Sequence, residues 1–535
     1  MIAVSRAWDI ASKETLLPEM LVELTYRVSD LGIHEAATVT GVNADSGSKI
    51  SDLLTNPSSA EQKYTALNWN AWGLDGSFVY YDAEYKKDSF SGGYYSQFNS
   101  PEWAEGANPQ IVMSFPELRT NSLPGLIITW SCSWNEWATA FKVTAYRANE
   151  IVAEKIITDN KSVTSEVEIA LEGYTKIVIT VLAWSLPHGL ARCSGINLGM
   201  YTVLEKNDLL GYTHTQSTDL LSASLPKNSI NFRLRNEKAQ WNPENLSGQD
   251  RFLMDQQEIH VRYGMALPEG TQWIEGGLFW LSEWDIPSNG LEASFTARDI
   301  ITFMNESYTG MKTGTLYEIA ENALRQTYLP VLSTGAPSYE LDPVLKNYST
   351  SFGGDFTVAE VLQLVAHAGC CVMYQDRLGT LRIRPWEPQY GGYVIDQSIS
   401  YTHPEYTISR PLRSVSIGYG DNLRLELIHS ARGEVQTVDN EMVKTQSDAD
   451  RVGTKALEVL GNRKVISGDF RADMRLDCLD SVIVTSKYAS NIIGLTDVEY
   501  SITGGAFRGR YTGRVVSVKL ETAQYFVGDL YAGEV

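Results

Sequence analysis

Residues 230–234 read Ile-Asn-Phe-Arg-Leu, an alternation of apolar and polar side chains. Residues 259–263, Ile-His-Val-Arg-Tyr, repeat the same alternation. Because alternate residues of a strand point to one face of a sheet, both stretches predict half-buried strands of antiparallel sheets. Similar runs recur between turn signals, and the 28 Tyr and 13 Trp residues are of types that favour strands. The chain is therefore predicted to be mainly β.

Length and composition narrow the class of protein. The chain has 535 residues, enough for roughly three or four domains, and its 43% hydrophobic and 20% charged residues are typical of folded proteins. The 65 acidic residues outnumber the 44 basic ones, which gives a formal net charge of −21. This balance excludes a broad surface of clustered Lys and Arg that would hold nucleic acid. Solubility accounts for much of the acidity.

Targeting and membrane segments are also missing. No run approaches the ~20 consecutive apolar residues of a membrane span, and residues 1–20 lack the apolar core and cleavage site of a signal peptide. We therefore expect neither conventional export nor stable membrane insertion. The five cysteines show no C-x-x-C spacing, so we expect no disulfide framework, no zinc site, and synthesis in a reducing cytoplasm.

No catalytic or cofactor motif stands out. The seven histidines are scattered singly, and the G-x-S-x-G, P-loop and Rossmann patterns are absent. Gly504 and Gly505 lie in a Gly-rich stretch that lacks the following helix of a phosphate loop. Glu283 and Asp285 share one strand face, and Glu136 lies between two tryptophans, but 65 acidic residues make such coincidences expected. We predict no metal, no cofactor and no enzymatic activity.

Helices are predicted in two parts of the chain. Thr315 with Glu318, and Thr357 with Glu360, form capping boxes in front of apolar stripes of helical spacing. Two short apolar strands joined by a turn that ends in glycine follow the second helix, within residues 371–383. These elements predict a small α+β unit. A third helix is predicted in the last third of the chain, where it starts near Ser447 and closes at Gly461.

Residues 65–200 differ from their surroundings. They hold seven of the 13 tryptophans and many short strands without a convincing helix. About 130 residues of evenly spaced strands is the size of one β-sandwich. Trp130 and Trp184, each within an apolar strand, are predicted to lie in its core.

Several phrases, taken in order along the chain, resemble the baseplate hub (tail-tip, tail-associated) structural proteins of long-tailed bacteriophages. The phrase at 64–77 is similar to an opening found in many of these tail proteins. The other phrases are 230–236 with 241–245, 277–284 with 295–299, the second helix with its hairpin, and 438–440 with 479–484. Each phrase alone is weak evidence of resemblance, and it is their order along the chain that indicates the family.

The resemblance implies a fold and a division into domains. The expected fold is mainly β and multi-domain (α+β overall), with two hub-type β-barrel tube domains, a small α+β domain and an inserted jelly-roll-like β-sandwich. The first barrel domain would be discontinuous, over residues 1–76 plus 200–305. The insert would cover 77–199 and look like a carbohydrate-binding module, the α+β domain 306–392, and the second barrel, with one helix, 393–535.

The resemblance also implies a role in the virion. Three copies would form a hub that joins the tail tube to the host-recognition apparatus and frames the DNA exit channel. The implied partners are two further copies of the chain, a distal tail protein, a tape measure protein and tail fibre or receptor-binding proteins. DNA would only pass through the channel. The chain would be made in the host cytoplasm and end in the tail tip.

The insert carries the candidate binding residues, because exposed aromatic rings stack on the apolar faces of sugars. Amide and carboxylate groups beside such rings can hydrogen-bond the hydroxyls of a host cell-surface polysaccharide. The candidate residues are Trp134, Asn135, Glu136, Trp137, Tyr94, Tyr95 and Trp103. The alternative is that these aromatic residues fill the core, where large side chains usually lie.

Two other functions stay open at this point. The chain could be a stand-alone polysaccharide-binding adhesin or receptor-binding protein, which the oligomeric state of the purified chain would help to distinguish from a hub. A depolymerase is a more distant alternative, which incubation with host cell-wall glycan would test.

Overall fold

The computed structural model describes most of the chain. The described residues are 2–14, 18–29, 37–44, 93–100, 108–120, 123–131, 135–237, 239–242, 256–286, 291–327, 336–388, 393–420, 423–503 and 506–516, with the single residues 245, 253, 329, 332 and 334. The phrase at 64–77 that contributes to the family resemblance lies outside them.

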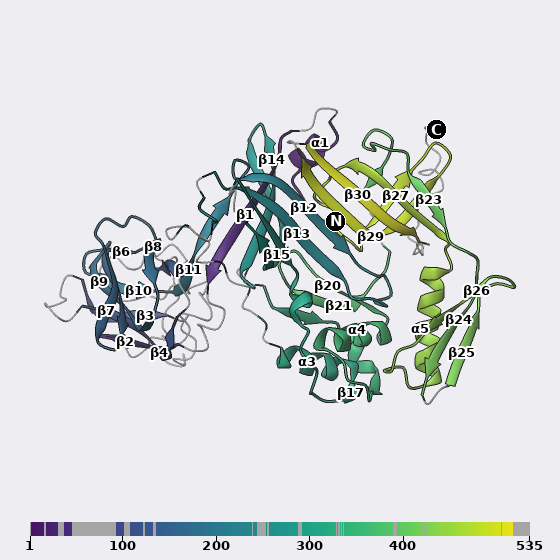
Figure 1. The fold of residues 1–535 in the computed structure, drawn as a ribbon, viewed down its shortest axis with the longest axis horizontal. Helices are drawn as coiled ribbons and strands as arrows, with labels where there is room; N and C mark the ends of the chain where they lie inside the picture. The colour runs from purple at the N-terminus through teal and green to yellow at the C-terminus, as the bar shows by residue number, and fades with distance from the viewer. Residues whose placement is uncertain are drawn as a thin grey trace, which may run out of the picture.

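One 15-stranded sheet joins the early and late parts of the chain (Figure 1). Its strands are, in spatial order, β23 (Glu405–Ile408), β27 (Lys464–Arg471), β30 (Ala506–Val515), β29 (Ser490–Thr503), β12 (Leu209–Ser217), β13 (Lys227–Arg235), β16 (Glu292–Arg298), β15 (Gly270–Asp285), β14 (Glu258–Leu267), β1 (Met20–Ser29), β11 (Gly195–Leu204), β5 (Leu123–Thr129) and β8 (Thr164–Leu171). Beside this path, β28 (Ser481–Thr485) pairs with β29 and β22 (Val394–Ile395) pairs with β28. The mainly β prediction is confirmed, and the runs at 230–234 and 259–263 are strands β13 and β14.

The prediction of two β-barrels is wrong for the described residues, because none of their sheets closes on itself. Strand β12 pairs with β13 on one side and with β29 on the other, so Thr213 lies between Asn231 and Ser501. The early strands thus continue into the late strands instead of returning to their own first strand. At the other end, β11 pairs with β5, which carries the sheet into the Trp-rich region.

The Trp-rich region adds a second sheet of five strands. These are, in spatial order, β2 (Thr38–Val42), β4 (Gln110–Arg119), β9 (Tyr174–Trp184), β6 (Ala138–Arg147) and β7 (Glu150–Ile157), with the pair β3 (Tyr94–Asn99) and β10 (Leu190–Cys193) nearby. The Trp130 ring, just after β5, lies 5.1 Å from that of Phe141 and 6.0 Å from that of Trp184. Trp130 and Trp184 are buried, which confirms their predicted core positions.

The α+β unit lies below the large sheet in Figure 1. It contains α3 (Leu316–Gln326), α4 (Val358–Ala368), the 3-10 turns η4 (Ile300–Phe303) and η5 (Pro343–Asn347), the sheet of β18 (Tyr339–Leu341), β21 (Leu381–Pro385) and β20 (Cys371–Gln375), and the pair β17 (Thr313–Thr315) and β19 (Ser349–Ser351). Both predicted capping boxes are present, at Thr315 and at Thr357. The hairpin between β20 and β21 turns through Gly379, whose φ of +91° favours a residue without a Cβ.

The third predicted helix is α5 (Gln446–Leu460), which packs on a separate sheet of β25 (Leu423–Ile428), β24 (Leu412–Tyr419) and β26 (Glu434–Val438). Thr445 caps its first turn and Gly461 follows its last. At Gly453 a Cβ would lie 2.5 Å from the Ile417 side chain, so glycine allows the helix to approach the sheet closely.

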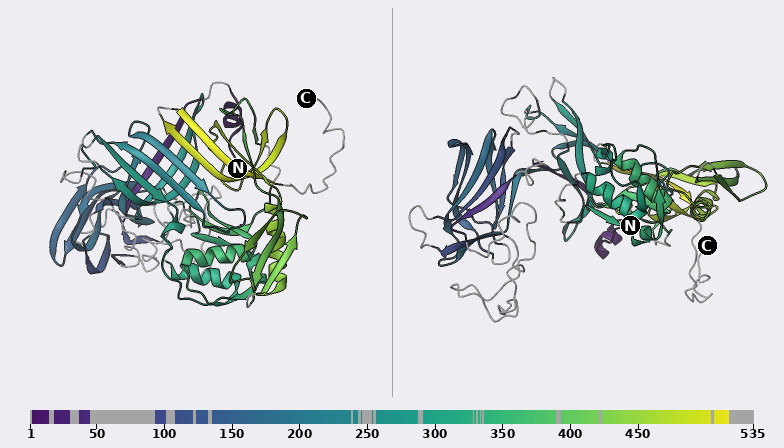
Figure 2. Two further views of the ribbon diagram at one scale, coloured as in Figure 1. Left: turned by 45° about the vertical axis from the view of Figure 1, so that its right-hand side comes forward. Right: turned by 90° about the horizontal axis from the view of Figure 1, so that it is seen from below.

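A short first helix, α1 (Arg6–Ala11), was not expected from the sequence. Ser5 caps it, and Trp8 is buried against Met265 and Leu267 of β14. Figure 2 shows the Trp-rich region projecting to one side of the molecule, with the strands β1 and β11 leading to it. Among the helices of the described ranges, none combines the length and apolarity needed to cross a membrane.

Candidate functional site

One face of the large sheet is polar over at least six neighbouring strands. On β13, Ile230, Phe232 and Leu234 are buried while Asn231 and Arg233 between them are exposed. The pairing registers align the outward residues into rows that cross the sheet. We call this surface the polar face, and it consists of Asp469, Arg508, Arg510, Glu499, Ser501, Thr213, Thr215, Ser229, Asn231, Arg233, Ser294, Thr296, Glu292, Arg298 and Glu283.

The charges of the polar face are largely matched across neighbouring strands. Arg233 lies 3.1 Å from Glu292, and the Arg298 guanidinium lies 2.9 Å from Glu283. A third pair, Arg510 with Asp469, is 3.0 Å apart. Such exposed pairs contribute at most about 1 kcal/mol each to stability. Their main effect is to neutralise the charges of the polar face, so that it presents hydroxyl and amide groups and few unmatched charges.

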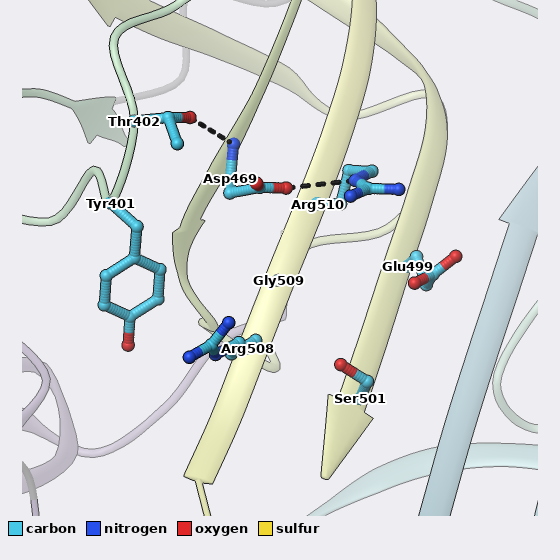
Figure 3. A pocket seen from close by; sticks show the side chains of 8 residues that line it. All are labelled: Tyr401, Thr402, Asp469, Glu499, Ser501, Arg508, Gly509 and Arg510. Atoms are coloured by element: carbon cyan, nitrogen blue, oxygen red, sulfur yellow. Dashed lines mark hydrogen bonds and ion pairs between the residues drawn. The ribbon is translucent and has the colours of Figure 1, made fainter. Parts of the chain in front are cut away.

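A hollow of about 490 Å³ lies at the end of the polar face (Figure 3). Its lining residues are Tyr401, Thr402, Asp469, Glu499, Ser501, Arg508, Gly509 and Arg510. The Arg508 guanidinium carbon lies 5.9 Å from the Tyr401 ring centre. Unlike Arg510, Arg508 has no carboxylate within ion-pair distance among the described residues. Its exposed guanidinium beside a tyrosine ring is therefore available to an anionic group.

An ion pair between the buried Arg377 and the half-buried Asp477 lies under the joint between the early and late strands. Arg377, in the turn after β20, donates from Nε to Asp477 Oδ2 at 2.8 Å and from Nη2 to Asp477 Oδ1 at 2.8 Å. Its Nη1 also donates to the Glu275 carbonyl at 2.7 Å. Burial by itself lowers the pKa of Arg377, but the charge and hydrogen bonds of Asp477 outweigh that effect, so the pKa is raised. The α+β unit is thus tied to both parts of the large sheet.

Aromatic residues surround this ion pair. His214 of β12 shares hydrogen bonds with the Tyr263 hydroxyl at 2.7 Å and with Asn228 Oδ1 at 2.8 Å. Burial lowers the pKa of His214 to about 4, so the ring is neutral near pH 7. The Tyr500 hydroxyl of β29 donates to the backbone carbonyls of Asp473 and Leu476. This joint holds strands in register, and no cluster of three or more metal-ligating side chains occurs in the described ranges.

Two of the predicted sugar-binding residues lie inside the protein. Tyr94 is buried, and its hydroxyl donates to the Val42 carbonyl at 2.9 Å. Glu136 is also buried, accepts a hydrogen bond from Trp184 Nε1 at 2.8 Å and lies 3.9 Å from Arg192. Both side chains therefore take core positions, where they cannot reach a ligand at the surface.

The other predicted sugar-binding residues are placed differently. Trp137 is half-buried and its indole N–H donates to the Asn160 carbonyl at 3.0 Å. Tyr95 is half-buried, with the Arg192 guanidinium carbon 5.9 Å from its ring centre, and Asn135 is exposed with a φ of +50°. Trp103 and Trp134 lie outside the described residues. The structure thus does not gather these residues into one described cluster.

The sequence contained a signal for part of this site and none for the rest. Alternation at 229–235 already separates an apolar from a polar face, so the outward residues of β13 were predictable. Arg377 was within the expected hairpin turn, but its partner Asp477 lies 100 positions later in the chain. The hollow depends on the pairing of β27 with β30, which no local pattern indicates.

Known proteins were compared with the chain by sequence and by structure. No family model and no curated protein matches its sequence. In structure, the chain is similar to a tail protein from Neisseria meningitidis (11% identity, TM-score 0.42, covering 58% of this chain and 93% of that one). A 43 kDa prophage tail protein from Shewanella oneidensis has the same identity and TM-score, and the match covers 58% of this chain and 95% of that one. A prophage tail protein from Listeria monocytogenes has 12% identity and a TM-score of 0.39, and the match covers 59% of this chain and 91% of that one.

Proposed function

We propose that the chain is a structural component of a phage tail tip: a homotrimeric baseplate hub that joins the tail tube to the host-recognition apparatus and frames the DNA exit channel. The observation that carries the proposal is the polar face, which runs in register across strands from residues 209–298 and 464–515. The ordered phrases that resemble the hub family support the same role.

The polar face has the chemistry of a channel wall. Proteins hold DNA through Lys and Arg that neutralise phosphates, and each such contact adds to affinity. On this face Arg233, Arg298 and Arg510 are each within 3.1 Å of a carboxylate on a neighbouring strand. Matched charges and hydroxyl groups neither retain the phosphates strongly nor repel them. DNA can therefore pass such a wall without stable binding.

The proposed assembly assigns a place to each part of the chain. Residues 1–76 plus 200–305 and residues 393–535 form the two tube-building parts, and 306–392 form the α+β part that fastens them. The partners are two further copies, a distal tail protein, a tape measure protein and tail fibre or receptor-binding proteins. The role is one of assembly, without catalysis, and the site of action is the virion.

Labelling of intact particles tests the position in the virion. Antibodies raised against the purified chain should bind the tip of the tail and no other part of the phage in electron micrographs. Native mass spectrometry of baseplates released from the particles should give three copies of the chain. Label along the tail shaft or on the capsid, or a copy number that is not a multiple of three, contradicts the proposal.

The insert at 77–199 is proposed to contact a host polysaccharide or another tail protein. Its described candidates are the half-buried Trp137 and Tyr95 and the exposed Asn135. Trp103 and Trp134, outside the described residues, stay candidates from the sequence alone. Binding to purified host cell-wall glycan should fall when Trp137 is changed to Ala, and should not change when the exposed Trp273 of β15, outside the insert, is changed to Ala. No glycan binding by the wild-type chain would leave the tail-protein contact as the role of the insert.

A further inference from the structure

The hollow of Figure 3 has a cationic end. Arg508 of β30 lies directly opposite Ser501 of β29 on one side and Arg471 of β27 on the other. Directly opposite side chains of neighbouring strands lie about 5 Å apart at their Cβ atoms. The Arg471 guanidinium donates to the backbone carbonyls of Ser12 and Glu14, and neither arginine has a carboxylate within ion-pair distance in the part of the chain that the structure describes. This end of the hollow therefore holds positive charge that no ion pair neutralises.

A bend at Tyr401 and Thr402 forms the wall beside this cationic end. The Tyr401 amide donates to the Asp469 carbonyl at 2.9 Å, and the Asp469 amide donates to the Thr402 hydroxyl oxygen at 3.3 Å. The Tyr401 ring is 56% exposed, and the Arg508 guanidinium carbon lies 5.9 Å from its centre. Hydrogen bonds to β27 thus hold a flat aromatic ring next to the guanidinium.

The rest of the hollow offers hydrogen-bond acceptors. Arg510 Nε donates to Asp469 Oδ1 at 3.0 Å, and Glu499 lies opposite Arg510 in the strand ladder. Among the described residues, none donates to Asp469 Oδ2 or to the Glu499 carboxylate. Figure 3 shows Glu499 and Ser501 across β30 from Tyr401. The Arg510 charge offsets the two carboxylates, which keep acceptor oxygens for the hydroxyl groups of a ligand.

Three features of this lining define the ligand. Arg508 favours a carboxylate, which a guanidinium binds through two parallel hydrogen bonds. Tyr401 favours the apolar face of a ring. Asp469 and Glu499 favour hydroxyl groups and repel a second anion, so a nucleic-acid strand with successive phosphates does not fit. The volume of about 490 Å³ is that of a small-molecule site and is larger than a carboxylate alone requires.

We propose that the hollow binds a sugar acid, such as a uronic acid residue, whose carboxylate pairs with the Arg508 guanidinium. The apolar face of the sugar ring lies on Tyr401, and its hydroxyl groups donate to Asp469 and Glu499. This site is outside the insert and is distinct from the sugar-binding candidates there. The inference rests on the lining of the hollow alone and does not depend on the proposed tail-tip function.

Saturation-transfer difference NMR of the full chain tests the site, because this method detects weak ligands of large proteins. Glucuronate is the probe, and glucose is the neutral control with the same ring. Saturation should pass to glucuronate, and glucose should bind at least about tenfold more weakly, because it lacks the carboxylate that pairs with Arg508. No saturation transfer to glucuronate, or equal affinity for the two sugars, overturns the proposal.

Competition with other anions identifies the chemistry that the hollow recognises. Acetate and inorganic phosphate, at the same concentration as glucuronate, should displace it only weakly, because they lack the ring and its hydroxyl groups. A tripeptide with a central aspartate should also be a weak competitor, because it offers the carboxylate without a sugar ring. Displacement by phosphate or by the peptide as effective as that by unlabelled glucuronate overturns the assignment of a sugar acid.

Variants with a matched control identify the contacts. Arg508→Gln should weaken glucuronate binding at least about tenfold, and Tyr401→Ala should weaken it severalfold. The control is Arg424→Gln, which removes an exposed arginine paired with Asp439 on a separate sheet and should leave binding unchanged. Equal amide exchange of β27, β29 and β30 in all variants verifies that they fold. If Arg508→Gln binds glucuronate like the wild type, or if Arg424→Gln has the same effect as Arg508→Gln, the site is wrong.

Discussion

The joint between β12 and β29 and the core of the Trp-rich region hold strands together by different means. The joint depends on the buried Arg377 and its half-buried partner Asp477, with tyrosines and a histidine around them. The Trp-rich core is held mainly by the packing of Trp130 on Phe141 and Trp184, with side-chain hydrogen bonds from Trp130 to Ser165 and from Trp184 to the buried Glu136. Apolar packing tolerates substitutions that conserve volume, whereas a buried charge tolerates no loss of its partner.

The largest expected effect is at the ion pair. Arg377→Met should lower the free energy of unfolding of the joint by about 2–3 kcal/mol, because it leaves the half-buried Asp477 carboxylate without its charged partner. Exchange of β12 and β29 amides at increasing urea concentration measures this loss. The matched control is Arg233→Met at an exposed pair, which should cost at most about 1 kcal/mol. Equal losses in the two variants would contradict the assigned importance of the joint.

Lowering the pH should weaken the joint through protonation of the buried His214. This histidine is not part of the Trp-rich core, which should be unaffected by its protonation. The pKa of His214 is about 4 in the folded protein and 6.5 ordinarily. A lowered histidine pKa gives stability that is complete above pH 6.5 and is lost as the pH falls through 4, here about 3 kcal/mol. The difference in unfolding free energy between wild type and His214→Gln should therefore shrink over this range. A difference that stays constant from pH 7 to pH 4 would show that His214 does not titrate as proposed.

A change to a smaller aromatic ring in the Trp-rich core should separate the two regions. Trp130→Phe should cost about 1–2 kcal/mol, because it leaves the Ser165 hydroxyl without its partner and reduces packing. Amides of β6 and β9 should report this loss in urea, and those of β12 and β29 should not. Equal destabilisation of both regions would mean that they unfold as one unit.

The smallest effect is expected on the polar face. Arg510→Gln breaks an exposed pair with Asp469 and should change stability by less than about 1 kcal/mol. The opposite change, Asp469→Asn, leaves the Arg510 guanidinium unmatched, so affinity for double-stranded DNA at low salt should rise. No gain in DNA binding by Asp469→Asn would refute the view that the paired charges keep the face from holding phosphates.

Local patterns were sufficient for part of the fold. The capping boxes at Thr315 and Thr357, the hairpin at 371–383 and the helix that begins at Gln446 follow from residues that are close in sequence. The prediction of closed barrels was wrong for the described part of the chain because sheet closure depends on which distant strands pair, and β12 pairs with β29 nearly 300 residues later. Local alternation fixes the face of a strand but not its neighbour.

The same limit applies to the candidate site. The outward residues of β13 were predictable from alternation, whereas Arg377–Asp477 and the hollow at Arg508 arise from contacts between distant segments. Tyr94 and Glu136 were assigned to a ligand because aromatic and acidic residues suit sugars. Their burial depends on distant segments, Trp184 in the case of Glu136 and the pairing of β3 with β10 in the case of Tyr94, which no local pattern indicates.

An image reconstruction of the tail end of the intact phage tests the central claim most directly. We expect three copies of the chain around the tail axis, with Thr213, Asn231 and Thr296 of the polar face turned toward the channel. A copy placed away from the axis, or a polar face buried against another protein instead of the channel, would contradict the account.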